Sequence, residues 1–562
     1  MASPTPSSRR SASKKLSARA AAWISSLSLL VFLIAAALVS QLYVNGRLDL
    51  TRDRQFTLSP AAIKTLDSLP DIITVRVVMS RDLPTQFQRL RTQAVDLLRE
   101  FEARSGGKFN LVFEDPGEDE EKRKAALSLG IQEVQLQEQS RDGVQVKRGF
   151  FGLALLYGDK KEVFPAIQNL ETFEYELIVR LIKLTGGTKT LGIVEGVDGN
   201  KFVLSLPGAP PMQGFDQAFM ALRTNIEQLY KIAPQYPAWM PIGEDVDVLL
   251  VAAPQRLTPA EKFRIDQFAM LGKPVIFLTP GMNIEIGQGI TGAPALNEYE
   301  DLLARYGVRV RKNVVLEPRQ WEMVRFGNAS FPSPYPYWIV VNYATLNPEN
   351  PITAGLETMS FPWTSSLDLD STAQPGLKSE PLVLTTAGAW EETGPVYLAP
   401  REMDKYVPVD QTMHMLAVLQ SGSLKSAYAG VKADSAGQAA FPGVAPDELT
   451  LALKQSQEDA RVLVVSSALF LSDFYLSYTN AAGNYHFLLN ALDYLALDPS
   501  LINVRSRQID EAPLDEEKVA SLKTGLILAN MGLVPLLLVV WGLAAGVRRR
   551  RRQRQIGEGP TA

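Results

Sequence analysis

The sequence predicts an α/β fold in which two transmembrane helices flank a folded periplasmic body. Two long runs without a charged residue, 20–46 and 524–547, lie near the ends of the 562-residue chain. About 20 apolar residues in a helix cross a hydrocarbon layer of roughly 30 Å, so each run is long enough to span a membrane. Between the two runs, short β-branched stretches alternate with stretches of helical apolar spacing, which is typical of α/β domains.

Basic residues next to the two runs predict how the chain crosses the membrane. Residues 1–19 and 548–562 are basic tails, and the positive-inside rule places such tails in the cytoplasm. We therefore expect a protein of the bacterial inner membrane with both termini cytoplasmic and the main body periplasmic. A cleaved signal peptide is the alternative for the first run, but the apolar region of a signal peptide typically has only about 7–15 residues. The topology prediction depends on Arg9, Arg10, Lys14, Lys15, Arg19, Arg548, Arg549, Arg550, Arg551, Arg552 and Arg554.

Charge and cysteine content exclude several classes of function. The whole chain has a formal net charge of −4, and each basic tail contributes +5, which leaves −14 on the rest of the chain. A body this acidic repels nucleic acid, whereas the basic tails suit contact with anionic membrane lipid. The chain has no cysteine, so disulfides, thiolate metal sites and thiol nucleophiles are excluded.

The first part of the body, residues 47–185, is predicted to be a thioredoxin-like domain. Ser59 is a good N-cap residue and Pro60 follows it at the first helical position, so a helix is expected to begin there. The order β-α-β-α-β-β-α then follows, and it is this order alone that predicts the thioredoxin-like arrangement. The expected elements are a strand at 72–79, a helix at 85–104, a strand at 108–114, a helix at 118–129, strands at 131–137, 150–157 and 162–164, and a helix at 169–184.

The second part of the body, residues 188–510, is predicted to be a doubly wound α/β domain. Thr258 and Glu261 have the spacing of a capping box with Pro259 at the first turn, which predicts a helix that ends near residue 271. Residues 317–450 are rich in Pro, Gly, Ser and Thr and are expected to be insertions on the sheet. The other expected elements are strands at 190–195, 246–252, 275–278, 308–315 and 461–466, and helices at 216–232, 299–306 and 484–497.

The sequence predicts no catalytic residue, no metal site and no cofactor. The two histidines, His414 and His486, are too far apart in the sequence to form a local metal motif. Residues 186–190 do not have the register of a phosphate-binding loop. Residues 287–292 match G-x-G-x-x-G, but they lack the preceding strand and the following helix that a dinucleotide site requires.

Two features without catalytic chemistry predict contacts with other molecules. The aromatic and proline-rich stretch 331–338 is typical of contact surfaces, and its candidate residues for a partner or ligand surface are Phe331, Tyr335, Tyr337 and Trp338. Packing of these rings against the domain's own core is the alternative. In the second uncharged run, small residues would let a neighbouring membrane helix approach closely. These small residues are Gly525, Gly532, Gly542 and Gly546.

Several segments together resemble a known family. Residues 48–51 and 57–60 after the first run, 247–254 with 257–261 in the middle, and 483–490 near the end are similar to GldG-type auxiliary subunits of gliding-motility-like ABC transport systems. The resemblance implies a role beside a separate permease and a separate ATPase. It also implies an α/β domain like those of class I glutamine amidotransferases or flavodoxins. Those amidotransferases use a nucleophilic cysteine, so this chain would have the fold without the reaction.

These observations predict a non-catalytic, membrane-anchored accessory subunit of an ABC transport system. Its spans are expected to contact the permease and ATPase, and its periplasmic body is expected to bind a substrate or a partner protein. One alternative is a membrane-tethered receptor for glycan or peptidoglycan fragments, with the 331–338 aromatics as its sugar platform. A further alternative is an enzyme that uses carboxylates alone, although pairs such as Asp368 with Asp370 and Glu391 with Glu392 are expected to be solvated loop charges.

Overall fold

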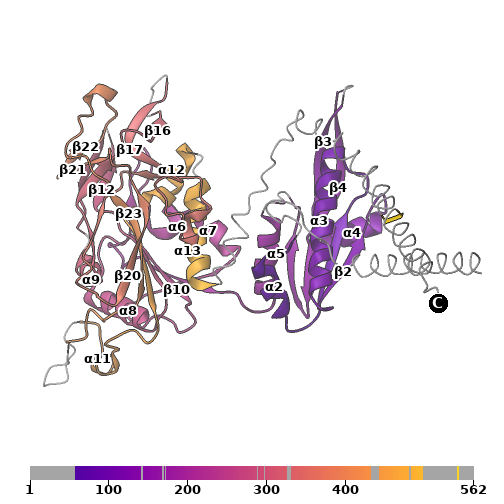
Figure 1. Ribbon diagram of the computed structural model, residues 1–562, viewed down its shortest axis with the longest axis horizontal. Coiled ribbons are helices and arrows are strands. Elements are labelled where there is room, and N and C mark those ends of the chain that lie inside the picture. The colour runs from indigo at the N-terminus through magenta and orange to yellow at the C-terminus, as the bar shows by residue number, and fades with distance from the viewer. Residues whose placement is uncertain are drawn as a thin grey trace, which may run out of the picture. The chain divides into compact units, whose positions relative to one another are not determined.

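The computed structural model has the mixed α/β character that the sequence predicts (Figure 1). It describes residues 57–497, apart from short gaps, together with Trp541 and Gly542. The gaps are residues 141–142, 168–169, 171, 288, 297, 326–330, 432–441 and 480–481.

The prediction of two transmembrane helices needs correction. Among the residues that the structure describes, no helix is both long enough and apolar enough to cross a membrane. The predicted spans, 20–46 and 524–547, lie outside these residues except for Trp541 and Gly542. The assignment to the inner membrane, with cytoplasmic tails and a periplasmic body, was derived from these spans and is corrected with them.

The described part of residues 57–185 contains one mixed sheet with helices. Its strand order is β2-β1-β4-β3, and β5 pairs with the half of β4 that also pairs with β1. β1 is parallel to β2 and antiparallel to β4. The elements are α2 (Pro60–Asp67), β1 (Ile73–Met79), α3 (Thr85–Arg104), β2 (Phe109–Glu114), α4 (Glu120–Leu129), β3 (Glu133–Ser140), β4 (Gly143–Tyr157), β5 (Lys160–Phe164) and α5 (Phe173–Leu184).

Local sequence explains where α2 begins. For β4, only the second half of the strand was predicted from the sequence. The hydroxyl of Ser59 accepts a hydrogen bond from the backbone N–H of Ala62 at 3.1 Å, as an N-cap does. The apolar residues 150–157 were expected to be a strand because they enter the core. Residues 143–149 pair with β3 alone. Only Val144 and Val146 are apolar there, and this short alternation was not included in the expected strand at 150–157.

The described part of residues 188–497 contains a larger sheet with helices on both faces. β9, β6, β10, β11 and β24 are parallel neighbours, and β23 is antiparallel to β24. The strands of the sheet and its edge are β6 (Thr190–Val194), β9 (Lys231–Pro234), β10 (Val248–Ala252), β11 (Val275–Leu278), β14 (Val308–Val310), β19 (Leu367–Leu369), β20 (Leu377–Leu384), β23 (Met415–Gly422) and β24 (Ala460–Val465).

The remaining elements cover this sheet or form small sheets beside it. The helices are α6 (Gly214–Ala218), α7 (Met220–Glu227), α8 (Pro259–Met270), α9 (Glu300–Arg305), α10 (Pro351–Ala354), α11 (Pro446–Leu451), α12 (Asp473–Tyr478) and α13 (Ala482–Ala496), with 3-10 turns at Met403–Lys405 and Leu469–Leu471. The smaller strands are β7 (Val203–Leu204), β8 (Met212–Gln213), β12 (Met282–Ile286), β13 (Ile290–Pro294), β15 (Asn313–Leu316), β16 (Trp321–Val324), β17 (Ser333–Asn342), β18 (Thr358–Pro362), β21 (Trp390–Thr393) and β22 (Val396–Tyr397).

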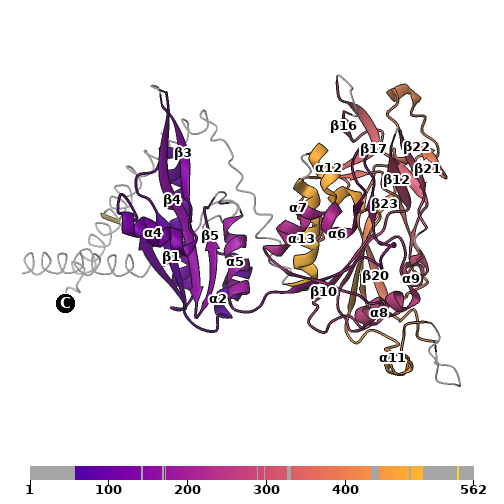
Figure 2. The ribbon, with the colours of Figure 1, turned by 180° about the vertical axis from the view of Figure 1, so that it is seen from behind.

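Two hydrophobic clusters bury the two faces of the central strands. Alternate residues of β10 and β11 pack with α6, α7 and α13 on one face and with α8 and α9 on the other. Figures 1 and 2 show these helices on opposite sides of the sheet. All five residues of β10 are buried, which is why this strand is a continuous apolar run in the sequence. The capping box of α8 is confirmed, because Thr258 and Glu261 exchange hydrogen bonds of 2.6 and 3.2 Å.

Two predicted elements are each divided into two in the structure. The helix expected at 216–232 is two short helices, because the backbone leaves the helical region at Phe219 and the segment ends in β9. The single strand expected at 308–315 is two strands in different sheets. β14 pairs with β19 and β15 pairs with β21, so the chain turns at Arg311 and Lys312.

A fully buried carboxyl group lies on α13. Asp493 accepts hydrogen bonds from the hydroxyls of Tyr230 at 2.6 Å and Tyr175 at 2.9 Å. Burial raises the pKa of Asp493 from 3.8 to about 8. Between these two values the folded protein holds a proton that the unfolded chain has released, so the free energy of unfolding falls as pH rises through this window.

Replacing this carboxyl should change how stability depends on pH. We expect Asp493→Asn to flatten the decrease in unfolding free energy between pH 5 and pH 8, because an amide mimics the protonated carboxyl and does not titrate. Asp493→Ala should cost about 1–3 kcal/mol at pH 5, since two buried tyrosine hydroxyls lose their acceptor. Urea unfolding at several pH values measures both effects. Parallel pH profiles for the wild type and Asp493→Asn would contradict the assignment.

Candidate functional site

Polar side chains gather where parallel strands β11 and β24 end. Ser466 directly follows β24, and the segment Thr364–Ser366 passes beside it before β19 begins. The hydroxyls of Thr364 and Ser466 are 3.0 Å apart, and the backbone N–H of Ser365 donates to the carbonyl oxygen of Ser466 at 3.4 Å. Open α/β sheets bind ligands at the carboxyl ends of their strands, so a binding site is expected at this edge.

Asn313, the first residue of β15, is the buried centre of this region. Its amide nitrogen donates to the hydroxyl of Ser366 at 2.8 Å, and its amide oxygen accepts from the backbone N–H of Ser366 at 3.0 Å. Its backbone carbonyl accepts from the hydroxyl of Ser365 at 2.7 Å. The same amide nitrogen also donates to the carboxylate of Glu391 on β21. One fully buried side chain therefore connects three segments that are far apart in the sequence.

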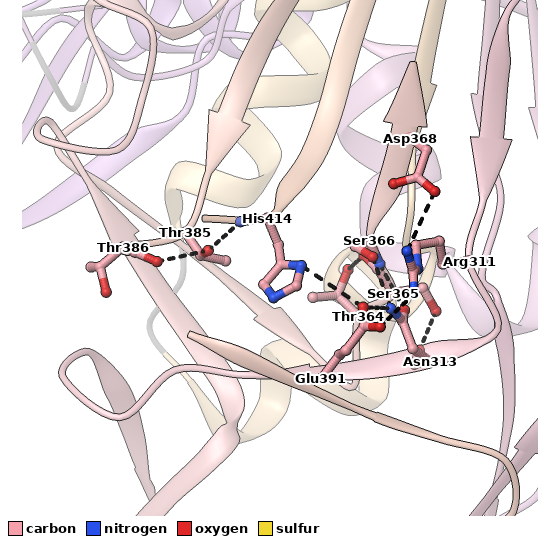
Figure 3. Close-up of polar contacts among 10 residues, drawn as sticks. All are labelled: Arg311, Asn313, Thr364, Ser365, Ser366, Asp368, Thr385, Thr386, Glu391 and His414. Atoms are coloured by element: carbon pink, nitrogen blue, oxygen red, sulfur yellow. Dashed lines mark hydrogen bonds and ion pairs between the residues drawn. The ribbon is translucent and has the colours of Figure 1, made fainter. Parts of the chain in front are cut away.

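Glu391 and Arg311 form the charged part of the site, which Figure 3 shows. An amino group of Arg311 donates to Glu391 Oε1 at 2.5 Å. A second Arg311 nitrogen lies 3.5 Å from Asp368 Oδ2 on β19. Arg311 stands at the turn between β14 and β15, and its backbone N–H donates to the carbonyl of Ser366 at 2.9 Å. The turn that divides the predicted strand is therefore what places the guanidinium between two carboxylates.

His414 lies on the other side of Glu391, just before β23. Its backbone N–H donates to the hydroxyl of Thr385 at 2.8 Å, and its Nδ1 is 3.9 Å from Glu391 Oε2. The side chain is only 8% exposed, and Nε2 has no hydrogen-bond partner within the described part of the chain. Burial is the main cause that lowers the pKa of His414 below 6.5; Glu391 opposes this shift and Arg311 adds to it.

These residues line a groove of about 690 Å³. Its polar lining includes Arg311, Asp368, Glu391 and His414, and its apolar lining comes from the two ends of β19, the end of β20 and residues 409–415. A groove of this size is in the range of small-molecule and peptide sites. It combines apolar walls with a few converging polar groups, which is the usual composition of a binding site.

The hydroxyl groups of the site are hydrogen bonded to groups other than the imidazole. Ser365 donates to Asn313, Ser366 accepts from Asn313, and Thr364 pairs with Ser466. Among the described residues, none of these hydroxyls is hydrogen bonded to the His414 ring, as a serine nucleophile would be to its base. The described residues also contain no group of three or more His, Asp or Glu side chains arranged to hold a metal ion.

The aromatic residues proposed as a contact surface are core residues in the structure, with one exception. Tyr335, Tyr337 and Trp338 are fully buried, whereas Phe331 is 81% exposed. The three buried residues lie on β17, which is paired with β16 and β18. The rings pack on one another and on Trp363 and Tyr475. The prediction of an exposed surface is therefore wrong for these three residues, and the alternative of core packing holds.

This burial predicts a large effect on stability. We expect Trp338→Ala to lower the free energy of unfolding by about 3–5 kcal/mol, because it removes a large buried ring and leaves a cavity. Phe331→Ala is the matched control, and it should change stability by less than about 0.5 kcal/mol. Urea denaturation monitored by circular dichroism measures both. Equal stabilities of the two variants would show that Trp338 is not a core residue.

The other residues singled out from the sequence lie elsewhere or outside the described residues. Gly525, Gly532, Gly546 and all eleven basic topology residues are outside them. Gly542 is described, and apart from its own helix backbone no described heavy atom lies within 4 Å of the position that a Cβ would take there. The G-x-G-x-x-G match at 287–292 falls on the antiparallel hairpin of β12 and β13, so it lacks the helix N-terminus that would hold a pyrophosphate.

Sequence reasoning missed most of the site. Asp368 and Glu391 were expected to be solvated loop charges, and Arg311 and Asn313 were counted within one strand. A usable signal was the break of apolar residues by Arg311, Lys312 and Asn313 in the middle of that run. A break of this kind indicates a turn, and turns at strand ends are where functional side chains gather.

Comparison with known proteins shows the family. A family model for auxiliary proteins, described as "ABC-type uncharacterized transport system", matches residues 188–491, which is more than half of the chain. The chain belongs to this family. A second model, for a domain of unknown function (DUF7088), matches residues 52–156. The family gives the protein an accessory role in an ABC transport system and implies association with such a system.

The individual relatives do not indicate a function for this protein. An uncharacterized protein of Borreliella burgdorferi (strain ATCC 35210) is 22% identical over 518 residues, which cover 90% of this chain and 94% of that protein. A solved structure, titled "mmIFT52 N-terminal domain", is 13% identical with a TM-score of 0.31, and the match covers 55% of this chain and 97% of that one. The narrower resemblance to GldG-type subunits and gliding motility stays a prediction.

The histidines allow a direct test of the site's electrostatics. We expect Glu391→Gln to lower the pKa of His414 further, because the carboxylate favours the charged ring, and Arg311→Gln to raise it. NMR titration of the two histidines measures both shifts, and His486→Gln assigns the signals. Because the folded-state pKa is below 6.5, His414 should make the unfolding free energy rise with pH between the two values. Shifts in the opposite directions would contradict the geometry around Glu391.

Proposed function

We propose that this protein is a non-catalytic accessory subunit that associates with a separate ABC permease and a separate ATPase. We further propose that the groove at the carboxyl edge of its large sheet is where it receives a substrate or a partner protein. The family match supports the accessory role, and the groove supports the binding role. The observation that carries the second part is the convergence of Arg311, Glu391 and His414 on one groove that also has apolar walls.

The hydrogen bonding of the site favours binding over bond cleavage. A serine hydrolase needs a hydroxyl activated by a neighbouring base. Here the hydroxyls of Ser365 and Ser366 are engaged with Asn313, and Nδ1 of His414 is 3.9 Å from the nearest carboxylate oxygen, beyond hydrogen-bond distance. The side chains are thus fixed by one another, which suits a preformed binding surface.

The glycan-receptor alternative loses its main support. Its sugar platform was the aromatic stretch on β17, and the rings of Tyr335, Tyr337 and Trp338 are inaccessible. A platform for a sugar needs an exposed aromatic face, so these three rings are not available for that role.

Isolation of the protein with its partners tests the accessory role. The full chain, with an affinity tag, is to be expressed at native level in its own organism and purified in mild detergent. We expect an ABC permease and an ABC ATPase to co-purify in near-stoichiometric amounts, as measured by quantitative mass spectrometry. The matched control is an unrelated tagged protein of similar abundance. Recovery of neither partner above this control would count against the proposal.

A further inference from the structure

The groove is acidic as well as apolar. Its lining residues include one guanidinium, that of Arg311, and three carboxylates, those of Asp368, Glu391 and Asp410. Arg311 is engaged by Glu391 at 2.5 Å and by Asp368 at 3.5 Å, so its charge is neutralised within the site. Asp410 is exposed and makes no hydrogen bond or ion pair with other described residues. With a neutral His414, the lining has a net charge of −2, which favours a cationic ligand.

His414 adds a hydrogen-bond acceptor to this lining. Burial keeps its ring neutral near pH 7, and the carboxylate of Glu391 on the Nδ1 side favours the proton on Nδ1. The lone pair of Nε2 then has no donor among the described residues, although the side chain is 92% buried. A buried acceptor without a donor is destabilising, so a ligand that donates a hydrogen bond there is favoured.

The rim of the groove exposes apolar side chains. Leu369 is 38% exposed, Met413 53% and Val409 59%, and all three line the groove. The volume of about 690 Å³ is more than one side chain needs. Methionine adapts to varied apolar partners, which suits the binding of a flexible chain. The ligand should therefore carry apolar groups on both sides of its cationic nitrogen.

We propose that this groove binds an extended peptide segment in which a lysine or arginine is flanked by apolar side chains. The cationic nitrogen lies among Asp368, Glu391 and Asp410 and donates to Nε2 of His414, while the apolar neighbours cover Leu369, Val409 and Met413. This inference rests on the proposed function and names what the groove receives. The peptide comes from a partner polypeptide, because free lysine or arginine has no neighbouring apolar side chains to cover the rim.

Binding of synthetic peptides to the purified full chain tests the proposal. The probe is fluorescein-labelled leucine-lysine-valine-lysine-leucine amide, and fluorescence anisotropy gives the dissociation constant. The comparison peptides replace both lysines by glutamine or by glutamate. We expect the glutamine peptide to bind at least about fivefold more weakly, the glutamate peptide to bind weaker still, and the lysine peptide to lose affinity as salt increases.

Substitutions in the groove locate the binding. Asp368→Asn and Asp410→Asn should each weaken the lysine peptide by about two- to fivefold, as expected for partly exposed charges. Asp410 has a positive φ of 48°, a conformation that asparagine also tolerates, so this substitution leaves the backbone unstrained. His414→Phe keeps a ring without the acceptor and should weaken binding by about two- to tenfold. The matched control is Asp198→Asn, the same charge change at a residue whose side chain is 99% exposed and does not line the groove.

Defined outcomes overturn the proposal. It is wrong if the glutamine peptide binds within twofold of the lysine peptide, or if the Asp368→Asn and Asp410→Asn double variant binds like Asp198→Asn while its thermal unfolding is normal. It is also wrong if lysine amide, as a free molecule, displaces the probe as well as the unlabelled peptide does, because the ligand is then a small amine. The assay uses the purified protein alone, so its failure is separable from a failure to recover a permease and an ATPase.

Discussion

The groove depends on one buried amide. The side chain of Asn313 uses its nitrogen and its oxygen to hold Ser366, and the same nitrogen reaches Glu391. This amide links the segment before β19 to the strand β21, beside the second link that Arg311 makes between Ser366 and Glu391. A hydrophobic side chain of the same size would leave the backbone N–H of Ser366 and one Glu391 oxygen unpaired, and such losses are costly in a buried position. The position of Glu391, and with it the charge around Arg311 and His414, therefore depends on Asn313.

Some buried polar groups of the interior have hydrogen-bond partners and others do not. Asp266 on α8 is fully buried and accepts hydrogen bonds from the hydroxyls of Tyr306 at 2.9 Å and Ser426 at 2.6 Å and from the backbone N–H of Ala427 at 2.9 Å. This carboxyl is satisfied within the fold, and burial is what raises its pKa. His414 is also buried, at 8% exposed, yet Nε2 has no partner among the described residues. The satisfied carboxyl fixes the fold, whereas the side chain of His414 lines the groove with one acceptor unpaired.

The parts of the fold that local chemistry determines could be predicted from the sequence. The capping box at Thr258 fixed the start of α8, and the buried run at 248–252 fixed β10. The turn at Arg311 was missed although Arg311, Lys312 and Asn313 interrupt the apolar run, because the different partners of β14 and β15 are not visible in one sequence. The site was missed for the same reason. Its residues come from positions between 311 and 466, and long-range pairing, which one sequence does not reveal, brings them together. The prediction of a contact surface at the aromatic stretch was wrong for a different reason. In the sequence, an aromatic strand that is buried between two neighbouring strands has the same composition as an exposed contact surface.

Glu391 determines which ligands the groove favours. A guanidinium at the carboxyl edge of an α/β sheet would ordinarily attract an anion, as Arg311 would if it were free. Glu391 binds Arg311 at one oxygen and Asn313 at the other, so the arginine is occupied and the carboxylate is held on both sides. The charges that remain for a ligand are then those of Asp368 and Asp410, both acidic. The same carboxylate, on the Nδ1 side of His414, favours the proton on Nδ1, which leaves the lone pair on Nε2. One residue thus makes the lining both negative and hydrogen-bond accepting, and these two properties together favour a donor cation over any anion.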